Sequence, residues 1–184
     1  MVKSNLTRRY IMYKKIILLA AVPFLLSAAN LTLTDGEIKA HTKVFGDSNI
    51  NPSTKIITVD VSMDDTIESL KGKFSIKAKD LKSSKSDRDE HMHEALEVTK
   101  YPEIIVDIQS VIKIEDAYKL DGTVTLHGVT KPLNTIAQIN KNEDGLTING
   151  SFSVNTTEHG MKPIKLLFLT VRERIDITYD LLLK

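Results

Sequence analysis

Residues 120–133 carry the clearest structural signal in the sequence, reading Leu-Asp-Gly-Thr-Val-Thr-Leu-His-Gly-Val-Thr-Lys-Pro-Leu. From Tyr118 to His127, apolar residues alternate with polar ones, which is typical of a β-strand with one buried and one exposed face. Gly122 and Gly128 bracket the strand and permit a bend or a close backbone approach. We expect Lys131-Pro132 to end it, because proline cannot donate a backbone hydrogen bond.

The same alternation recurs on both sides of this stretch. One apolar face per strand indicates antiparallel pairing, because parallel strands are usually buried on both faces. The alternating segments predict about eight strands, at residues 37–44, 57–63, 73–79, 104–114, 118–127, 133–140, 146–154 and 174–181.

Two segments break the alternation and predict short helices. Asp64–Lys71 is the shorter and suits a single helical turn. Ser86–Val98 has acids in its first turn and Met92, Ala95 and Leu96 on one face, which indicates an amphipathic helix. Strands with one apolar face and little helix form either a sandwich or a closed barrel. The long segments 104–114 and 118–127 favour a tilted barrel wall. The predicted fold is therefore all-β, an antiparallel barrel of about eight strands with one or two short helices.

Residues 1–29 predict a secretory signal peptide that is cleaved after Ala29 and directs residues 30–184 to the periplasm as a single domain. The segment has five basic residues and no acid, followed by the apolar run Ile16–Leu26 and small residues up to Ala29. The run is shorter than the roughly 20 apolar residues that span a bilayer, so no membrane segment is expected after cleavage. Met12 is an alternative start, and Thr7–Met12 loosely resembles a twin-arginine signal, which leaves the export route open.

Charge and composition exclude several classes of protein. The chain has 184 residues, with 25 Lys and Arg, 24 Asp and Glu, and no Cys. A formal charge of +1 argues against nucleic-acid binding, which needs a strongly basic surface. The lack of cysteine excludes disulfides, thiolate nucleophiles and cysteine-ligated metal sites.

The residues expected to face the barrel interior are mostly aliphatic. An eight-stranded barrel is either filled by its own side chains or holds one small ligand. An aliphatic lining favours a hydrocarbon chain over a sugar or a nucleotide. The predicted lipid-binding residues are Phe74, Ile76, Met92, Ile104, Val106, Ile108, Leu120, Val124, Leu126, Ile148 and Phe152.

Two motifs resemble those of the YceI-like family of periplasmic polyisoprenoid-binding proteins. Residues 120–133 are similar to the family stretch G-x-L-T-L-x-G-x-T-K-P-V. Arg88-Asp-Glu-His-Met92 followed by Tyr101-Pro-Glu-Ile104 is similar to its signature R-D-x-H-L…Y-P-x-I. The resemblance implies an extended lipocalin-like barrel that holds a long isoprenoid chain without a metal or catalysis. An isoprenoid or fatty-acyl lipid is thus the expected ligand, and a homodimer is left open. The alternative is a filled barrel that acts as an envelope-stress or protein-interaction module without a lipid.

Several polar residues invite a more specific function. His91 and His93 suggest a metal site, but residues two apart on a helix point about 200° away from each other, so we predict none. Arg88 lies on the helix face expected to meet the barrel, where a guanidinium either pins the helix to backbone carbonyls or reaches a polar ligand end. The family resemblance implies a hydrogen bond from His91 under the helix. His127 is expected on the polar face of its strand, and His41 and His159 at the surface. No nucleophile elbow, phosphate loop or paired-carboxylate motif occurs, so no enzyme activity is predicted.

Overall fold

The structure, a computed structural model, describes residues 29–44, 48–163, 165–166 and 169–184. The predicted all-β antiparallel barrel is confirmed, and each expected segment corresponds to one long strand. These eight strands are β2 (Leu33–Val44), β5 (Thr58–Met63), β6 (Lys71–Lys77), β7 (Glu103–Ile114), β8 (Ala117–Leu126), β9 (Val129–Asn142), β10 (Gly145–Asn155) and β13 (Arg174–Leu183).

The expected strand count was too low, because five further strands of two or three residues occur in the described part of the chain. Strands this short show no alternation, so their sequences carry no period-two signal. They are β1 (Ala29–Leu31), β3 (Ser48–Ile50), β4 (Ser53–Thr54), β11 (Lys165–Leu166) and β12 (Leu169–Thr170). Helix α1 spans Ser86–Ala95, and the single turns η1 (Ile67–Ser69), η2 (Ala78–Asp80) and η3 (Thr157–His159) are 3₁₀ helices.

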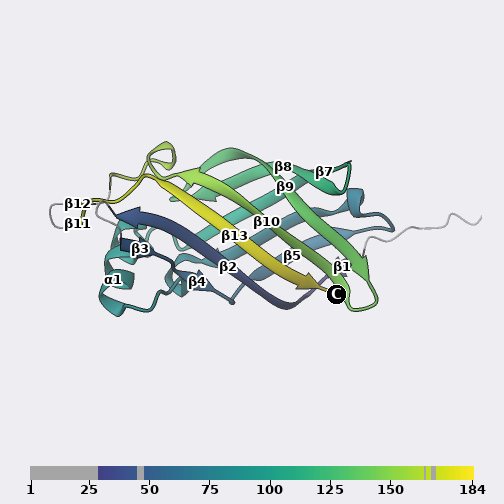
Figure 1. Cartoon of the computed structure of the whole chain (residues 1–184), viewed down its shortest axis with the longest axis horizontal. Coiled ribbons are helices and arrows are strands. Elements are labelled where there is room, and N and C mark those ends of the chain that lie inside the picture. Colours follow the sequence, from purple (N-terminus) through teal and green to yellow (C-terminus); the bar gives the residue numbers. More distant parts are fainter. Residues whose placement is uncertain (1–28, 45–47, 164, 167–168) are drawn as a thin grey trace, which may run out of the picture.

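The main sheet runs in the order β1-β5-β6-β7-β8-β9-β10-β13-β2-β3, with β4 also on β2. Only Thr32 separates β1 from β2, yet β1 pairs with β5 and β2 pairs with β13. One continuous segment therefore joins the two sides of the curled sheet (Figure 1). Thr32 and Lys184 exchange backbone hydrogen bonds of 2.7 and 2.9 Å, which fix this junction.

The strand through Tyr118 ends earlier than expected, and Pro132 lies inside the next strand, β9. His127 and Gly128 have φ values of 52° and 73° and form a two-residue hairpin turn between Leu126 and Val129. Counting from this hairpin, Pro132 faces Thr123 at a position where its nitrogen points away from β8. The ladder from β9 to β10 begins only at Ala137, so no ladder hydrogen bond is lost at Pro132.

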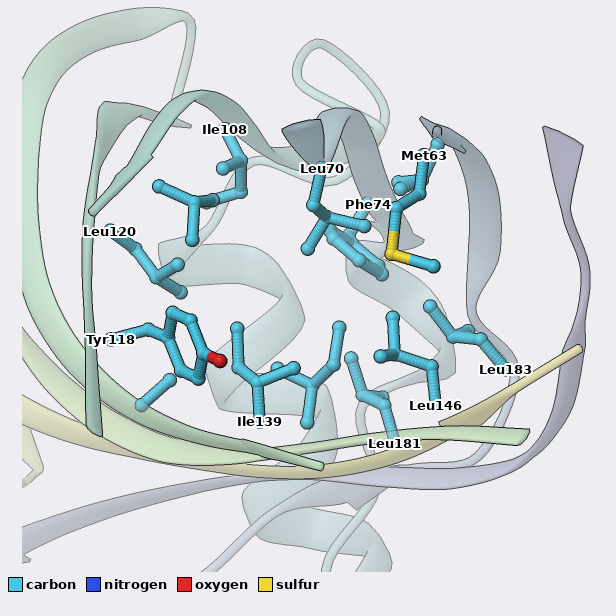
Figure 2. Packing of buried hydrophobic residues seen from close by; sticks show 14 of the residues in the cluster. Met63, Leu70, Phe74, Ile108, Tyr118, Leu120, Ile139, Leu146, Leu181 and Leu183 are labelled. Carbon is cyan, nitrogen blue, oxygen red and sulfur yellow. The ribbon is translucent and has the colours of Figure 1, made fainter. Parts of the chain in front are cut away.

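The barrel interior has two halves of different character. In the half nearer the C-terminus, inward side chains fill the space, and Figure 2 shows Met63, Leu70, Ile139, Leu146 and Leu183 pointing toward a common centre. A second cluster, which includes Leu81, Leu96, Val124 and Met161, lies toward the end covered by α1. The packed half closes one end of the barrel, so any ligand space must lie toward α1.

The N-terminal signal peptide predicted for residues 1–29 lies outside the described residues, except for Ala29, which begins β1. Within the part of the chain that the structure describes, no helix is both long and apolar enough to cross a membrane.

Candidate functional site

A cavity of about 200 Å³ lies between the packed half of the barrel and α1. Its floor is made by buried residues that also belong to the packed core, among them Leu70, Ile108, Leu133 and Leu181. All eleven residues that the sequence analysis predicted to bind lipid line this one cavity. Period-two alternation brings the ten strand residues together because every second residue of neighbouring strands points to the same face, and Met92 joins them from α1.

The hydroxyl groups on the cavity wall are mostly bound to the protein backbone. Thr42 Oγ1 donates to the carbonyl of Arg172 or Arg174 at 3.2 Å, and Thr135 Oγ1 donates to the carbonyl of Ser151 at 2.7 Å. Thr156 Oγ1 donates to the carbonyl of Glu173 at 3.1 Å. Because these donors are already used, the wall presents mainly carbon to a ligand.

Tyr179 is the one tyrosine among the described residues that line the cavity. Its oxygen is buried, and no described group lies in hydrogen-bonding geometry with it. Burial raises the pKa of Tyr179 to about 12, and the nearby Thr135 hydroxyl offsets this only in part. The hydroxyl therefore stays neutral over the physiological pH range.

The lid of the cavity consists of α1 and the turn after it, residues 86–101. Met92 and Leu96 of the lid face the cavity, and Leu96 is buried against the barrel. His93 Nε2 lies 2.9 Å from the carbonyl oxygen of Leu81, so this histidine anchors the middle of the lid. Asp89 accepts hydrogen bonds from the backbone and hydroxyl groups of Ser83 at 2.8 and 2.7 Å, which anchors its beginning.

The end of the lid is held by the hairpin between β8 and β9. Glu97 Oε2 and His127 Nε2 lie 3.1 Å apart, and the rings of Tyr101 and His127 have centroids 4.2 Å apart. Tyr101 also packs directly on Gly128, where a Cβ atom would lie 2.6 Å from its ring. The beginning and the middle of the lid are therefore fixed to the segment that precedes α1, and its end is fixed to the barrel at the β8–β9 hairpin.

Arg88 and His91 line the cavity at the lid side, and Arg172 lines it from the segment that precedes β13. The side chains of His91 and Arg172 are 62% and 47% exposed, which places them at the mouth rather than in the interior. Arg88 is half-buried. A polar ligand end at this mouth would meet guanidinium and imidazole groups.

Sequence reasoning placed three histidines wrongly and missed the role of a fourth. The hydrogen bond under the helix is made by His93, whereas His91 is exposed and lies 3.7 Å from Glu94. His159, expected at the surface, is buried and lies 2.9 Å from the carbonyl oxygen of Val129. His127 sits in the hairpin turn rather than on a strand face. The contacts of His93 and His159 reach residues 12 and 30 positions away in the chain, so no local pattern reveals them.

Arg172 was also missed, because it belongs to no alternating segment. Among the described residues, no group of three or more His, Cys, Asp or Glu side chains could hold a metal ion.

Comparison with known proteins agrees with this architecture. The model of the YceI-like domain matches residues 30–183. The chain belongs to the YceI-like family. No curated protein matches its sequence.

Solved structures share the fold at low sequence identity. BcnA from Burkholderia cenocepacia has a TM-score of 0.70 and 12% identity, over 79% of this chain and 94% of that one. A polyisoprenoid binding domain from Saccharophagus degradans, implicated in plant cell wall breakdown, has a TM-score of 0.66 and 8% identity, over 84% and 98% of the two chains. A mutant of the Campylobacter jejuni YceI protein has a TM-score of 0.57 and 20% identity, over 75% and 88%. These likenesses establish the barrel architecture of the YceI-like chain.

Proposed function

We propose that this YceI-like protein is a non-catalytic binding protein that holds the apolar chain of a lipid in the cavity under the lid. The observation that carries the proposal is the cavity itself, which is lined mainly by aliphatic and aromatic side chains, while its three threonine hydroxyls are bound to backbone carbonyls. Burying a hydrocarbon chain there is favourable by about 0.8 kcal/mol per CH₂ before ordering costs.

An isoprenoid is the expected chain, since a structural neighbour is a polyisoprenoid binding domain. A fatty-acyl chain would meet the same wall. The periplasm is the proposed location, on the strength of the basic and apolar pattern in residues 1–29.

The filled-barrel alternative is less well supported. Side chains fill only the half of the barrel around Met63, Leu146 and Leu183, and the half under the lid retains the cavity. A module that acts only through its outer surface gives no reason for an enclosed apolar space of this kind.

The test is mass spectrometry of the organic extract of protein purified from the periplasm. We expect a chain lipid in the wild type and none in Val106→Asp, which places a charge on the cavity wall. Ile136→Asp is the matched control, because Ile136 is 59% exposed on the outer face of β9. Ala40→Phe fills part of the cavity without adding a charge. It replaces Val106→Asp as the test variant if Val106→Asp does not fold.

Circular dichroism and thermal unfolding establish that each variant is folded. An empty wild-type extract, together with no uptake of added fatty acid or isoprenoid, would contradict the proposal. Unchanged lipid content in folded Val106→Asp and Ala40→Phe would place the lipid elsewhere.

A further inference from the structure

The guanidinium groups that line the cavity give its charged lining one sign. Among the described residues they belong to Arg88, from the lid, and Arg172, from the segment before β13, and the imidazole of His91 also lines the cavity from the lid. No Asp or Glu side chain lies among the described lining residues. An apolar pocket with a basic mouth has the charge distribution that fits an amphiphile with a negative head.

Arg172 is held at the mouth by its own backbone. Its N–H donates to the carbonyl of Lys43 at 2.9 Å, and its carbonyl lies 3.2 Å from the hydroxyl of the buried cavity residue Thr42. The backbone is thus fixed against β2, while the side chain remains 47% exposed. From this fixed backbone position, the guanidinium of Arg172 can donate two parallel hydrogen bonds to a carboxylate or a phosphate.

The acid nearest to Arg172 is largely committed to other groups. Asp176 accepts from Ser153 Oγ at 2.6 Å and from Arg174 Nε at 2.7 Å, whereas Arg172 Nη1 lies 3.9 Å from it. The Ser153 hydrogen bond and Arg174 also lower the pKa of Asp176. Among the described residues, Arg172 therefore has a weak partner in Asp176 and can bind an anion at the mouth.

We propose that the cavity selects amphiphiles with an anionic head, a carboxylate or a phosphate, and that Arg172 is the residue that determines this selectivity. Arg88 adds a second guanidinium and His91 an imidazole from the lid side of the mouth. The proposal rests on the proposed lipid-binding function and adds the chemistry of the ligand's polar end.

The experiment compares three probes with the same chain, dodecanoate, dodecyl phosphate and dodecanol, by isothermal titration of the full protein. We expect at least one of the two anions to bind about tenfold more tightly than the alcohol, because charge-assisted hydrogen bonds are stronger than neutral ones. The anion that binds more tightly identifies the head as carboxylate or phosphate.

Arg172→Gln is expected to remove most of this preference and leave dodecanol binding unchanged, while Arg172→Lys keeps part of it. Lys113→Gln is the control, because it also removes one positive charge, and Lys113 is exposed on β7 and does not line the cavity. Equal binding of all three probes to the wild type would overturn the headgroup assignment and leave chain binding intact. An equal loss of dodecanol and anion binding in Arg172→Gln would show a merely structural role. Binding of none of the three would overturn the lipid-binding function together with this proposal.

Discussion

Glu97 and His127 lie in contact, Oε2 to Nε2 at 3.1 Å, across the junction between the lid and the β8–β9 hairpin. Both residues have positive φ values, 47° and 52°, so each sits in a tight turn. The His127 side chain is 12% exposed and the Glu97 side chain 49%, so the contact lies at the rim of the lid. The contact is the polar part of the link that holds the end of the lid on the barrel.

Breaking this contact should loosen the lid. In a double-mutant cycle of Glu97→Gln and His127→Asn, we expect a coupling free energy of about 0.5–1 kcal/mol, measured by urea unfolding. Asparagine is chosen because it tolerates the left-handed backbone of residue 127. Glu94→Gln is the control, since Glu94 and His91 are both exposed. A coupling near zero would mean that Tyr101 packing, and not this contact, holds the end of the lid.

Gly128→Ala should destabilise the protein by about 1–3 kcal/mol, since it combines a left-handed backbone with a clash against Tyr101. Gly160→Ala separates the two effects. Gly160 has a nearly identical φ of 74°, but its Cβ atom would lie 3.6 Å from the nearest group, a side-chain carbon of Val129. Thermal unfolding of both variants measures the difference, which is the contribution of the Tyr101 contact. Equal losses would indicate that Tyr101 moves aside freely.

The alternation of the sequence predicted the wall of the site better than its two ends. Side chains such as Val124 and Ile148 were assigned inward because the strand period is two, and they do face one cavity. Alternation predicts whether a side chain points into or out of the barrel. It does not predict whether side chains from opposite walls pack against each other or leave a cavity between them. The filled half around Leu146 and Leu183 therefore could not be distinguished from the hollow half.

The mouth and the lid anchors depend on contacts between distant segments. His93 reaches Leu81, and Arg172 is held by Lys43, more than a hundred residues away in the chain. Neither residue has a local pattern that marks its role. By contrast, Arg88 lies on the helix face that was expected to meet the barrel, and it does line the cavity.

Tyr179 should make the protein sensitive to alkali. Its pKa is raised to about 12 in the folded protein from 10.0, so at high pH the unfolded chain loses this proton first. Stability is therefore complete below about pH 10 and falls as the pH rises towards 12, by about 2 kcal/mol from this residue. Tyr179→Phe should remove this part of the loss, which urea unfolding between these pH values measures. Identical alkaline curves for the variant and the wild type would show that the hydroxyl is not buried in solution.

Asp176 should contribute to stability in the opposite pH range. Hydrogen bonds from Ser153 and Arg174 lower its pKa below 3.8, so its stabilising effect is present above that value and is lost as the pH falls through the lowered pKa. We expect Asp176→Asn to be less stable than the wild type near neutral pH and to lose less stability on acidification. Urea unfolding from about pH 6 to about pH 2 follows both effects. A variant with the same acid dependence as the wild type would contradict the assignment.

The central claim is that an apolar chain lies inside the barrel, and photolabelling tests it most directly. A fatty acid with a diazirine in the middle of its chain is bound to the protein and irradiated, and the labelled residues are identified by mass spectrometry. Labels on cavity residues such as Val124, Ile148 and Phe152, and their loss in Ala40→Phe, are the predicted result. Labels confined to the outer-face residues Ile112 and Ile136 would contradict the account.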